Sequence, residues 1–183
     1  MAGGMAPRGA RSFLLLCLLV ATPSLSTAAE SITEPPRRPP VRSTDRRLLS
    51  LLEEGQRLSP TLRALVARLA ASDVVVYLQC DGPGAPDGRL TFVSTAGGHR
   101  YVVVRMAHFS WMQQIAIMAH ELQHAVEIAE TPAIVDGESL AREFRRIGYV
   151  NAWSSLPGLS FDSEAAVRIG HRVLRELMQD RSD

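Results

Sequence analysis

The stretch His120-Glu121-Leu122-Gln123-His124 lies inside a long, largely apolar run between Ser110 and Pro132. Two histidines four residues apart share one face of an α-helix, so their two imidazole rings can bind a single metal ion. Glu121 lies about 100° further round such a helix, where its carboxylate can reach a water molecule on that ion. The stretch therefore predicts a metal site on a long helix.

Flanking residues mark the ends of this helix. Ser110 and Gln113 form a capping-box pattern that predicts its start. Thr131-Pro132 predicts its end, because a residue before proline is pushed out of the α region. The histidines are expected to line a cleft beside polar neighbours, because a helical wheel places them opposite an apolar stripe. That stripe, expected to be buried, consists of Trp111, Ile115, Met118, Leu122, Ala125, Val126 and Ala129.

Apolar periodicity and turn residues predict the remaining elements. β-prone runs predict strands at 74–78, 89–95 and 100–106. The expected fold class is α+β, with a small antiparallel sheet of about three strands packed against the long motif helix and flanking helices. The flanking helices are expected at 45–54, ended by Gly55, at 60–69, at 136–147, closed by Gly148 in the left-handed conformation, and at 162–178, capped by Asp162.

Residues 1–29 are expected to be a signal peptide. Arg8 and Arg11 precede an apolar run, Phe13 to Ala21, and small residues follow it. A membrane anchor is the alternative, but the run is short for a bilayer span. We therefore expect cleavage near residues 28–29, export to the periplasm or the medium, and no membrane span in the mature protein.

The rest of the chain divides into a tether and a folded domain. Segment 30–44 is rich in Pro and Arg and is expected to be disordered, which leaves 45–183 as the metal-binding domain. Cys80 is the only cysteine after residue 29, so an internal disulfide is not expected. From Glu30 onward the chain carries 18 Arg and 19 Asp or Glu. This balance does not favour a nucleic-acid-binding surface.

The residues around the histidine pair are apolar as well, with Ile117-Met118-Ala119 before it and Ala125-Val126 after it. In this context the pattern resembles the HExxH signature of the zincin metallopeptidases, over about fifteen residues. The resemblance implies an exported zinc hydrolase in which His120 and His124 bind Zn²⁺, Glu121 is the general base, and the substrate is a peptide or protein. It also implies a minimal zincin-like core in which a strand at 89–95 or 100–106 pairs with the substrate.

The third metal ligand is not fixed by the motif, although catalytic zinc takes three protein ligands. In glutamate-type zincins it comes from a later helix, where Glu138 and Glu143 are candidates and Glu143 faces inward better. Glu127 is preferred here, because it lies within about 20° of His120 around the motif helix and one turn beyond His124. Its distance from His120 along the helix strains ligation, so Glu127 is expected either as a ligand or as a carboxylate that orients His124.

Two other functions compete with the hydrolase. The first is a non-catalytic metal-binding envelope protein that retains the zincin fold. The second is a di-iron carboxylate bundle, which needs a second Glu-x-x-His pair besides Glu121 and His124 and does not suit the predicted strands. For the hydrolase, Tyr149 and His171 are both candidates to stabilise the transition state, and the sequence selects neither.

Overall fold

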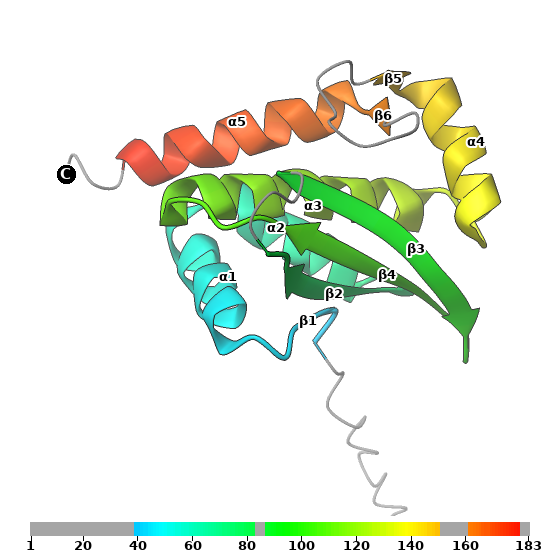
Figure 1. Ribbon diagram of the computed structural model, residues 1–183, viewed down its shortest axis with the longest axis horizontal. Coiled ribbons are helices and arrows are strands. Elements are labelled where there is room, and N and C mark those ends of the chain that lie inside the picture. Colours follow the sequence, from blue (N-terminus) through cyan, green and yellow to red (C-terminus); the bar gives the residue numbers. More distant parts are fainter. Residues whose placement is uncertain (1–38, 83–86, 151–160, 180–183) are drawn as a thin grey trace, which may run out of the picture. The chain divides into compact units, whose positions relative to one another are not determined.

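The computed structural model describes residues 39–82, 87–150 and 161–179 and has the α+β class that the sequence predicts (Figure 1). These residues form two sheets. The smaller sheet pairs β5 (Tyr149–Val150) with β6 (Phe161–Asp162). The larger one contains, in spatial order, β1 (Val41–Arg42), β2 (Val74–Cys80), β4 (His99–Met106) and β3 (Gly88–Ala96). The strands predicted at 74–78, 89–95 and 100–106 are thereby confirmed.

The direction of the strands differs from the expected antiparallel sheet. β3 and β4 do form an antiparallel hairpin, but β2 runs parallel to β4. Alternate residues of β4 from Arg100 to Met106 are buried, whereas every residue of β3 is at least partly exposed. Burial therefore favours β4 in the centre of the sheet and β3 at its edge. Since β3 begins at the end where β2 finishes, the hairpin returns β4 in the same direction as β2.

The folded part begins earlier than the sequence analysis placed it. Val41 and Arg42 belong to the segment expected to be a tether, yet they pair in parallel with Val76 and Tyr77 of β2. Val41 is only 3% exposed. The burial of this valine explains why ordered structure starts before Asp45.

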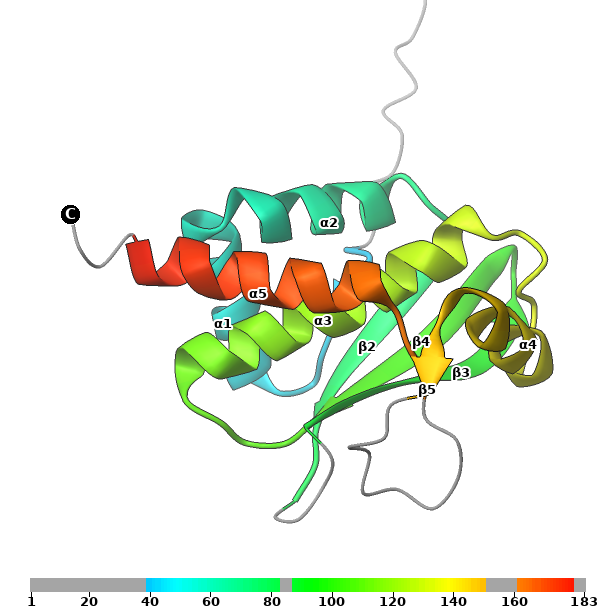
Figure 2. The ribbon, with the colours of Figure 1, turned by 90° about the horizontal axis from the view of Figure 1, so that it is seen from above.

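The helices form layers on the sheet. α3 (Trp111–Glu130), which carries the motif, contacts β2, β3 and β4 on one side and α5 (Glu164–Gln179) on the other (Figures 1 and 2). α1 (Arg46–Leu58) and α2 (Pro60–Ala70) also pack against α3, while α4 (Gly137–Ile147) lies against β3 and the small sheet. The helix predicted between Ser110 and Pro132 is thus confirmed, and it lies at the centre of the fold.

α3 is buried on more of its surface than the helical wheel predicts. Its polar side chains Glu121, Gln123 and His124 are buried together with the apolar stripe. Several elements cover this helix: α5 lies over the side near His120 that was expected to line an open cleft, β3 covers Glu121, and Phe144 of α4 packs on His124. Gly170 of α5 lies against α3, where an added Cβ would come into contact with the Cβ of His120 at 3.4 Å.

Gly55 does not end α1, which continues to Leu58. This glycine is buried between α2 and α3, where an added Cβ would lie 2.6 Å from Leu62 Cδ2 and 2.8 Å from Ile115 Cγ2. The position therefore requires a residue without a side chain, and not the backbone freedom of a helix end. Gly55 therefore marks a close contact between helices and not the end of a helix.

Residues 1–38, which include the expected signal peptide and most of the expected tether, lie outside the described residues. Those two expectations stay predictions. Among the residues that are described, no helix has both the length and the apolar character needed to cross a membrane.

Candidate metal centre

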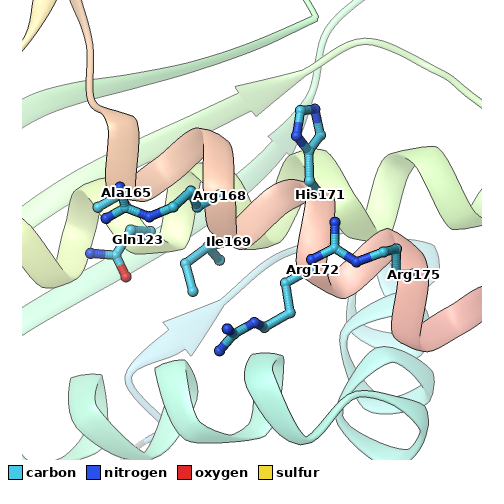
Figure 3. A pocket seen from close by; sticks show the side chains of 7 residues that line it. All are labelled: Gln123, Ala165, Arg168, Ile169, His171, Arg172 and Arg175. Carbon is cyan, nitrogen blue, oxygen red and sulfur yellow. The ribbon is translucent and has the colours of Figure 1, made fainter.

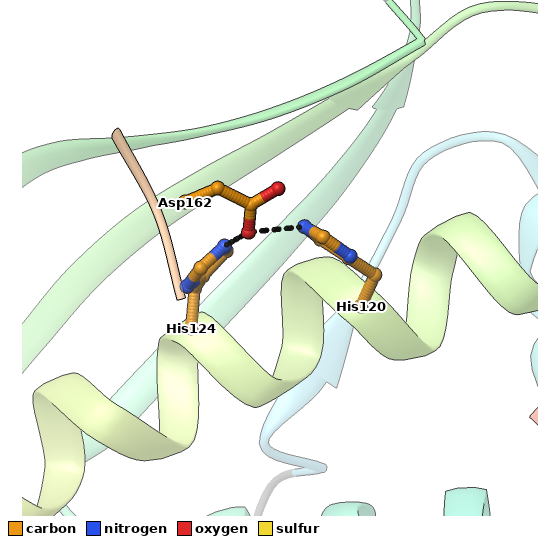
Figure 4. Close-up of side chains that lie close together, drawn as sticks. All are labelled: His120, His124 and Asp162. Atoms are coloured by element: carbon orange, nitrogen blue, oxygen red, sulfur yellow. Dashed lines mark ion pairs between the residues drawn. The ribbon is translucent and has the colours of Figure 1, made fainter. Parts of the chain in front are cut away.

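Three side chains from two parts of the chain converge beside α3. His120 and His124 project from the helix, and Asp162 comes from β6 (Figure 4). Asp162 Oδ1 lies 3.2 Å from His120 Nε2 and 3.5 Å from His124 Nε2. The potential ligand atoms of the three residues all lie within 4.8 Å of one another. Two imidazole nitrogens and one carboxylate oxygen are a donor set that suits a zinc ion with an open fourth position.

The two histidines differ in their exposure to solvent. Their ring centroids are 5.0 Å apart, and the ring planes are at 79° to each other. The His124 side chain is 7% exposed, with Phe144 of α4 packed edge-on at a centroid distance of 5.0 Å. The His120 side chain is 23% exposed. Access to the cluster from solvent is therefore greater on the His120 side.

Asp162 does not cap the last helix as predicted. The capping residue is Ser163, whose Oγ accepts a hydrogen bond from the N–H of Ala166 at 3.1 Å. Asp162 is instead held in the two-stranded ladder, where it pairs with Tyr149. Gly148 makes this possible with an extended backbone at φ −99°, not in the predicted left-handed conformation. An added Cβ on Gly148 would lie 2.6 Å from the carbonyl oxygen of Asp162.

The structure places Glu127 beside the metal-ligand cluster and not within it. Glu127 Oε2 lies 2.8 Å from His124 Nδ1, which is the ring nitrogen directed away from Asp162. Its other oxygen, Oε1, accepts a hydrogen bond from Ser163 Oγ at 2.6 Å. Of the two roles left open for Glu127, this geometry corresponds to the carboxylate that orients a histidine ligand.

Neither glutamate of α4 joins the cluster. The Glu143 carboxylate forms an ion pair with Arg146, and that of Glu138 forms one with Arg142. Asp162 was missed as a ligand because its position before a helix is explained equally well by capping. The sequence signal that could have identified Asp162 was the presence of an acidic residue just before the helix that covers α3.

Glu121 is buried under the edge strand β3. It is 5% exposed, and its carboxylate accepts a hydrogen bond from the backbone N–H of Leu90. Gly88 provides the space, since an added Cβ there would lie 2.5 Å from Glu121 Oε1. Burial raises the pKa of the Glu121 carboxyl, although the neighbouring histidines oppose this shift. The carboxylate thus lies next to the cluster and outside its ligand set.

The charges of the cluster are mutually stabilising. Burial alone would lower the pKa of His124, but hydrogen bonds to Asp162 and Glu127 outweigh it and raise the pKa to about 9. Burial alone would raise the pKa of Asp162, but its contacts with His120 and His124 hold that pKa well below its usual range. For Glu127 the contact with His124 likewise outweighs burial and lowers the pKa. A divalent cation can replace the protons that these imidazoles share with the carboxylates.

A separate depression follows α5 and does not include His120, His124 or Asp162 (Figure 3). His171, a candidate for transition-state stabilisation, lies there and is exposed. The side chain of Tyr149, the other candidate for transition-state stabilisation, lies outside the described residues. The depression is lined by Gln123, Ala165, Arg168, Ile169, His171, Arg172 and Arg175.

The metal-ligand cluster, the buried Glu121 and the orienting contact of Glu127 are thus defined by this chain's own geometry. They combine a motif on one helix with an aspartate 38 positions after its second histidine. In comparisons with known proteins, no family model, curated protein or solved structure matches this chain.

Proposed function

We propose that this protein is a zinc-dependent hydrolase of the metallopeptidase type, in which His120, His124 and Asp162 bind Zn²⁺ and Glu121 is the general base. One observation carries the proposal: both Nε2 atoms face the same oxygen of Asp162, at 3.2 and 3.5 Å, with Glu121 beside them. Bound zinc would supply a polarised water molecule whose pKa falls from 15.7 toward about 7.

The protein's own groups have complementary roles in this proposal. Glu121 is positioned to take a proton from the attacking water and later to give it to the leaving group. Its burial raises the pKa of the carboxyl, which makes the carboxylate a stronger base. Glu127 keeps a proton on Nδ1 of His124, so that Nε2 has its lone pair available for the metal ion.

A peptide is the substrate class that the edge strand supports best. β3 is the last strand in the sheet order, so one of its edges is unpaired in the described structure. This assigns the proposed substrate strand to residues 89–95, because β4, the other candidate, is paired on both sides. The contact of Leu90 in β3 with Glu121 supports this choice, because it brings the edge close to the proposed general base. An extended peptide can add to such an edge by main-chain hydrogen bonds.

Export is part of the same proposal. Arg8 and Arg11 before the apolar run Phe13 to Ala21 support a cleaved leader. The mature N-terminus can be determined by mass spectrometry of the exported protein. A start near residue 29 or 30 is expected, and retention of Met1 in the exported form would contradict cleavage.

The test combines metal analysis with peptide hydrolysis on the purified protein. The wild type should bind one zinc ion and cleave unstructured peptides. Glu121→Gln should retain zinc and lose hydrolysis, whereas Asp162→Ala should lose both. Glu143→Gln is the matched control, because Glu143 is paired with Arg146 outside the cluster, and it should keep both properties. A protein that binds no zinc after reconstitution would contradict the proposal.

A non-catalytic metal-binding protein is the second candidate, and the burial of Glu121 favours it. At 5% exposure and with a hydrogen bond from Leu90, this carboxylate is shielded from bulk water. Stoichiometric zinc without hydrolysis that depends on Glu121 would select this function.

A further inference from the structure

Ser163 lies at the junction of β6 and α5 and is 4% exposed. Its backbone N–H donates to Asp162 Oδ1 at 2.7 Å, and its hydroxyl donates to Glu127 Oε1 at 2.6 Å. The same hydroxyl accepts a hydrogen bond from the N–H of Ala166 at 3.1 Å. The three contacts therefore go to the candidate ligand Asp162, to the Glu127 carboxylate beside the cluster and to the helix that covers it.

These contacts join the two sides of the cluster. The Asp162 oxygen that accepts from the Ser163 N–H is the one that lies between His120 Nε2 and His124 Nε2. The Glu127 carboxylate that accepts from the Ser163 hydroxyl holds His124 Nδ1 through its other oxygen. Ser163 thus contacts a ligand from β6 and the orienting carboxylate from α3 at the same time.

We propose that Ser163 is a positioning residue of the metal centre, whose hydroxyl fixes the Glu127 carboxylate on His124 Nδ1. This inference rests on the zinc binding proposed above. Besides His124 and Ser163, the Glu127 carboxylate has one other described hydrogen bond, from Gln123 Nε2 at 3.5 Å. Without the hydroxyl, the carboxylate loses its shortest donor and the His124 ring loses its fixed orientation. Partners that orient a histidine ligand affect metal affinity by about 10- to 100-fold.

Helix capping is the simpler role that the test must separate from positioning. Glycine is nearly as good as serine at an N-cap, whereas alanine is poor. Ser163→Gly therefore removes the bond to Glu127 with little loss of capping. Ser163→Ala removes both, and Ser163→Thr retains a hydroxyl for both. Comparing the three variants separates the two roles even if Ser163→Ala folds poorly.

The experiment measures zinc dissociation constants by competition with a chelator and records the visible spectrum of the Co²⁺-substituted protein. Ser163→Gly should bind zinc about 10- to 100-fold more weakly and change the cobalt spectrum, as expected when an orienting partner is lost. Ser163→Thr should restore wild-type binding and the wild-type spectrum. Glu127→Ala should weaken binding, and the double variant Ser163→Gly/Glu127→Ala should be no weaker than Glu127→Ala alone, because the two residues act through one contact.

Unchanged zinc affinity and an unchanged cobalt spectrum in Ser163→Gly would overturn the role of Ser163 and leave the metal centre intact. Losses that multiply in the double variant would also overturn it, because the hydroxyl would then act independently of Glu127. A wild-type protein that binds no zinc would instead remove the proposed function itself, together with the inference. Loss of hydrolysis alone, with zinc bound, bears on the peptidase reaction only and leaves the affinity comparison valid.

Discussion

Arg100 shows how much of this fold depends on one buried cation. Its side chain is 6% exposed, and its Nη1 donates to the carbonyl oxygen of Ile128 in the last turn of α3 and to those of Thr131 and Ile134 after the helix. Its Nε and Nη2 also donate to the two carboxylate oxygens of Asp73. The last carbonyls of a helix have no partner within that helix. Arg100 adds a charged donor to these carbonyls, two of which also accept from backbone N–H groups, and attaches the motif helix to β4.

Arg100→Ala should therefore lower the free energy of unfolding by roughly 3 kcal/mol, because these carbonyls lose a charged donor. Urea unfolding followed by circular dichroism measures this change. Arg105→Ala, on the same strand, is the control. Arg105 is 34% exposed and lies 3.9 Å from its partner Asp81, so its removal should cost less than about 1 kcal/mol. Equal losses in the two variants would contradict the capping role.

The protons shared among the side chains of the cluster are expected to make the stability of the metal-free protein depend on pH. In the metal-free protein the pKa of His124 rises from its ordinary value of 6.5 to about 9, since hydrogen bonds to Asp162 and Glu127 outweigh burial. A raised pKa contributes stability that is complete below pH 6.5 and is lost as the pH rises through 9. The melting temperature in the presence of a chelator should therefore fall across that interval.

Asp162→Asn should reduce this dependence on pH, because it removes one of the partners that raise the pKa of His124. His171→Ala should leave it unchanged, since His171 is exposed and lies outside the cluster. Thermal melts of the three proteins between pH 6 and pH 10 make the comparison. A melting temperature of the wild type that rises through this interval would refute the assignment.

At the scale of the elements, local sequence patterns were sufficient to predict α3. They were not sufficient to predict how the other elements pack against it. Pro132 and the apolar periodicity predicted its extent, because both act through the helix itself. The capping box predicted at its start is absent: Ser110 Oγ contacts Gln113 Oε1 and makes no capping bond. Asp162 was missed for a different reason. It reaches the histidines only through the tertiary packing of β6 and α5, which no local period specifies.

Two glycines illustrate the same limit. Gly55 was predicted to end a helix, but it lies inside α1 and permits close contact with α2 and α3. Gly148 does follow the end of α4 as predicted, but its backbone is extended and it permits the close approach of β6. A glycine required by turn geometry and one required by packing look alike in a single sequence. The parallel pairing of β2 with β4 was equally hidden, because strand order depends on which strand can bury its inner face.

Gly88 offers a test of how the edge strand is placed against the site. An added Cβ would lie 2.5 Å from Glu121 Oε1 and 2.8 Å from Ile117 Cγ2, so Gly88→Ala must displace one of these groups. Overpacking of this kind costs about 1–3 kcal/mol. We expect peptide hydrolysis to fall more than zinc affinity, because Glu121 is the displaced group and the ligands are not. Gly82→Ala is the control, since nothing lies within 4 Å of its Cβ. Parallel loss of zinc and hydrolysis in Gly88→Ala would contradict this arrangement.

At the scale of the whole folded unit, α5 connects the metal cluster to the first helices. One end of α5 follows Asp162 and Ser163, and near its other end Glu176 accepts a hydrogen bond from Thr61 Oγ1 at 2.5 Å. Glu176 also accepts one from the hydroxyl of Ser59, at the start of α2. The helix that carries no motif residue is therefore held against the core at both ends, and Asp162, which precedes it, is positioned with it.

Zinc should consequently stabilise the whole unit and not only its site. The ligands come from α3 and from β6, so the complete set exists only when these parts are folded together. A ligand that binds only the native state at about 100 times its dissociation constant adds about 2.7 kcal/mol to the free energy of unfolding. Differential scanning calorimetry should show a higher melting temperature with zinc, and a chelator should reverse this increase.

The increase in melting temperature should disappear in Asp162→Ala and persist in Glu143→Gln, because only the first residue belongs to the cluster. An equal gain in both variants would mean that zinc binds elsewhere and that the convergence of His120, His124 and Asp162 is not a metal site.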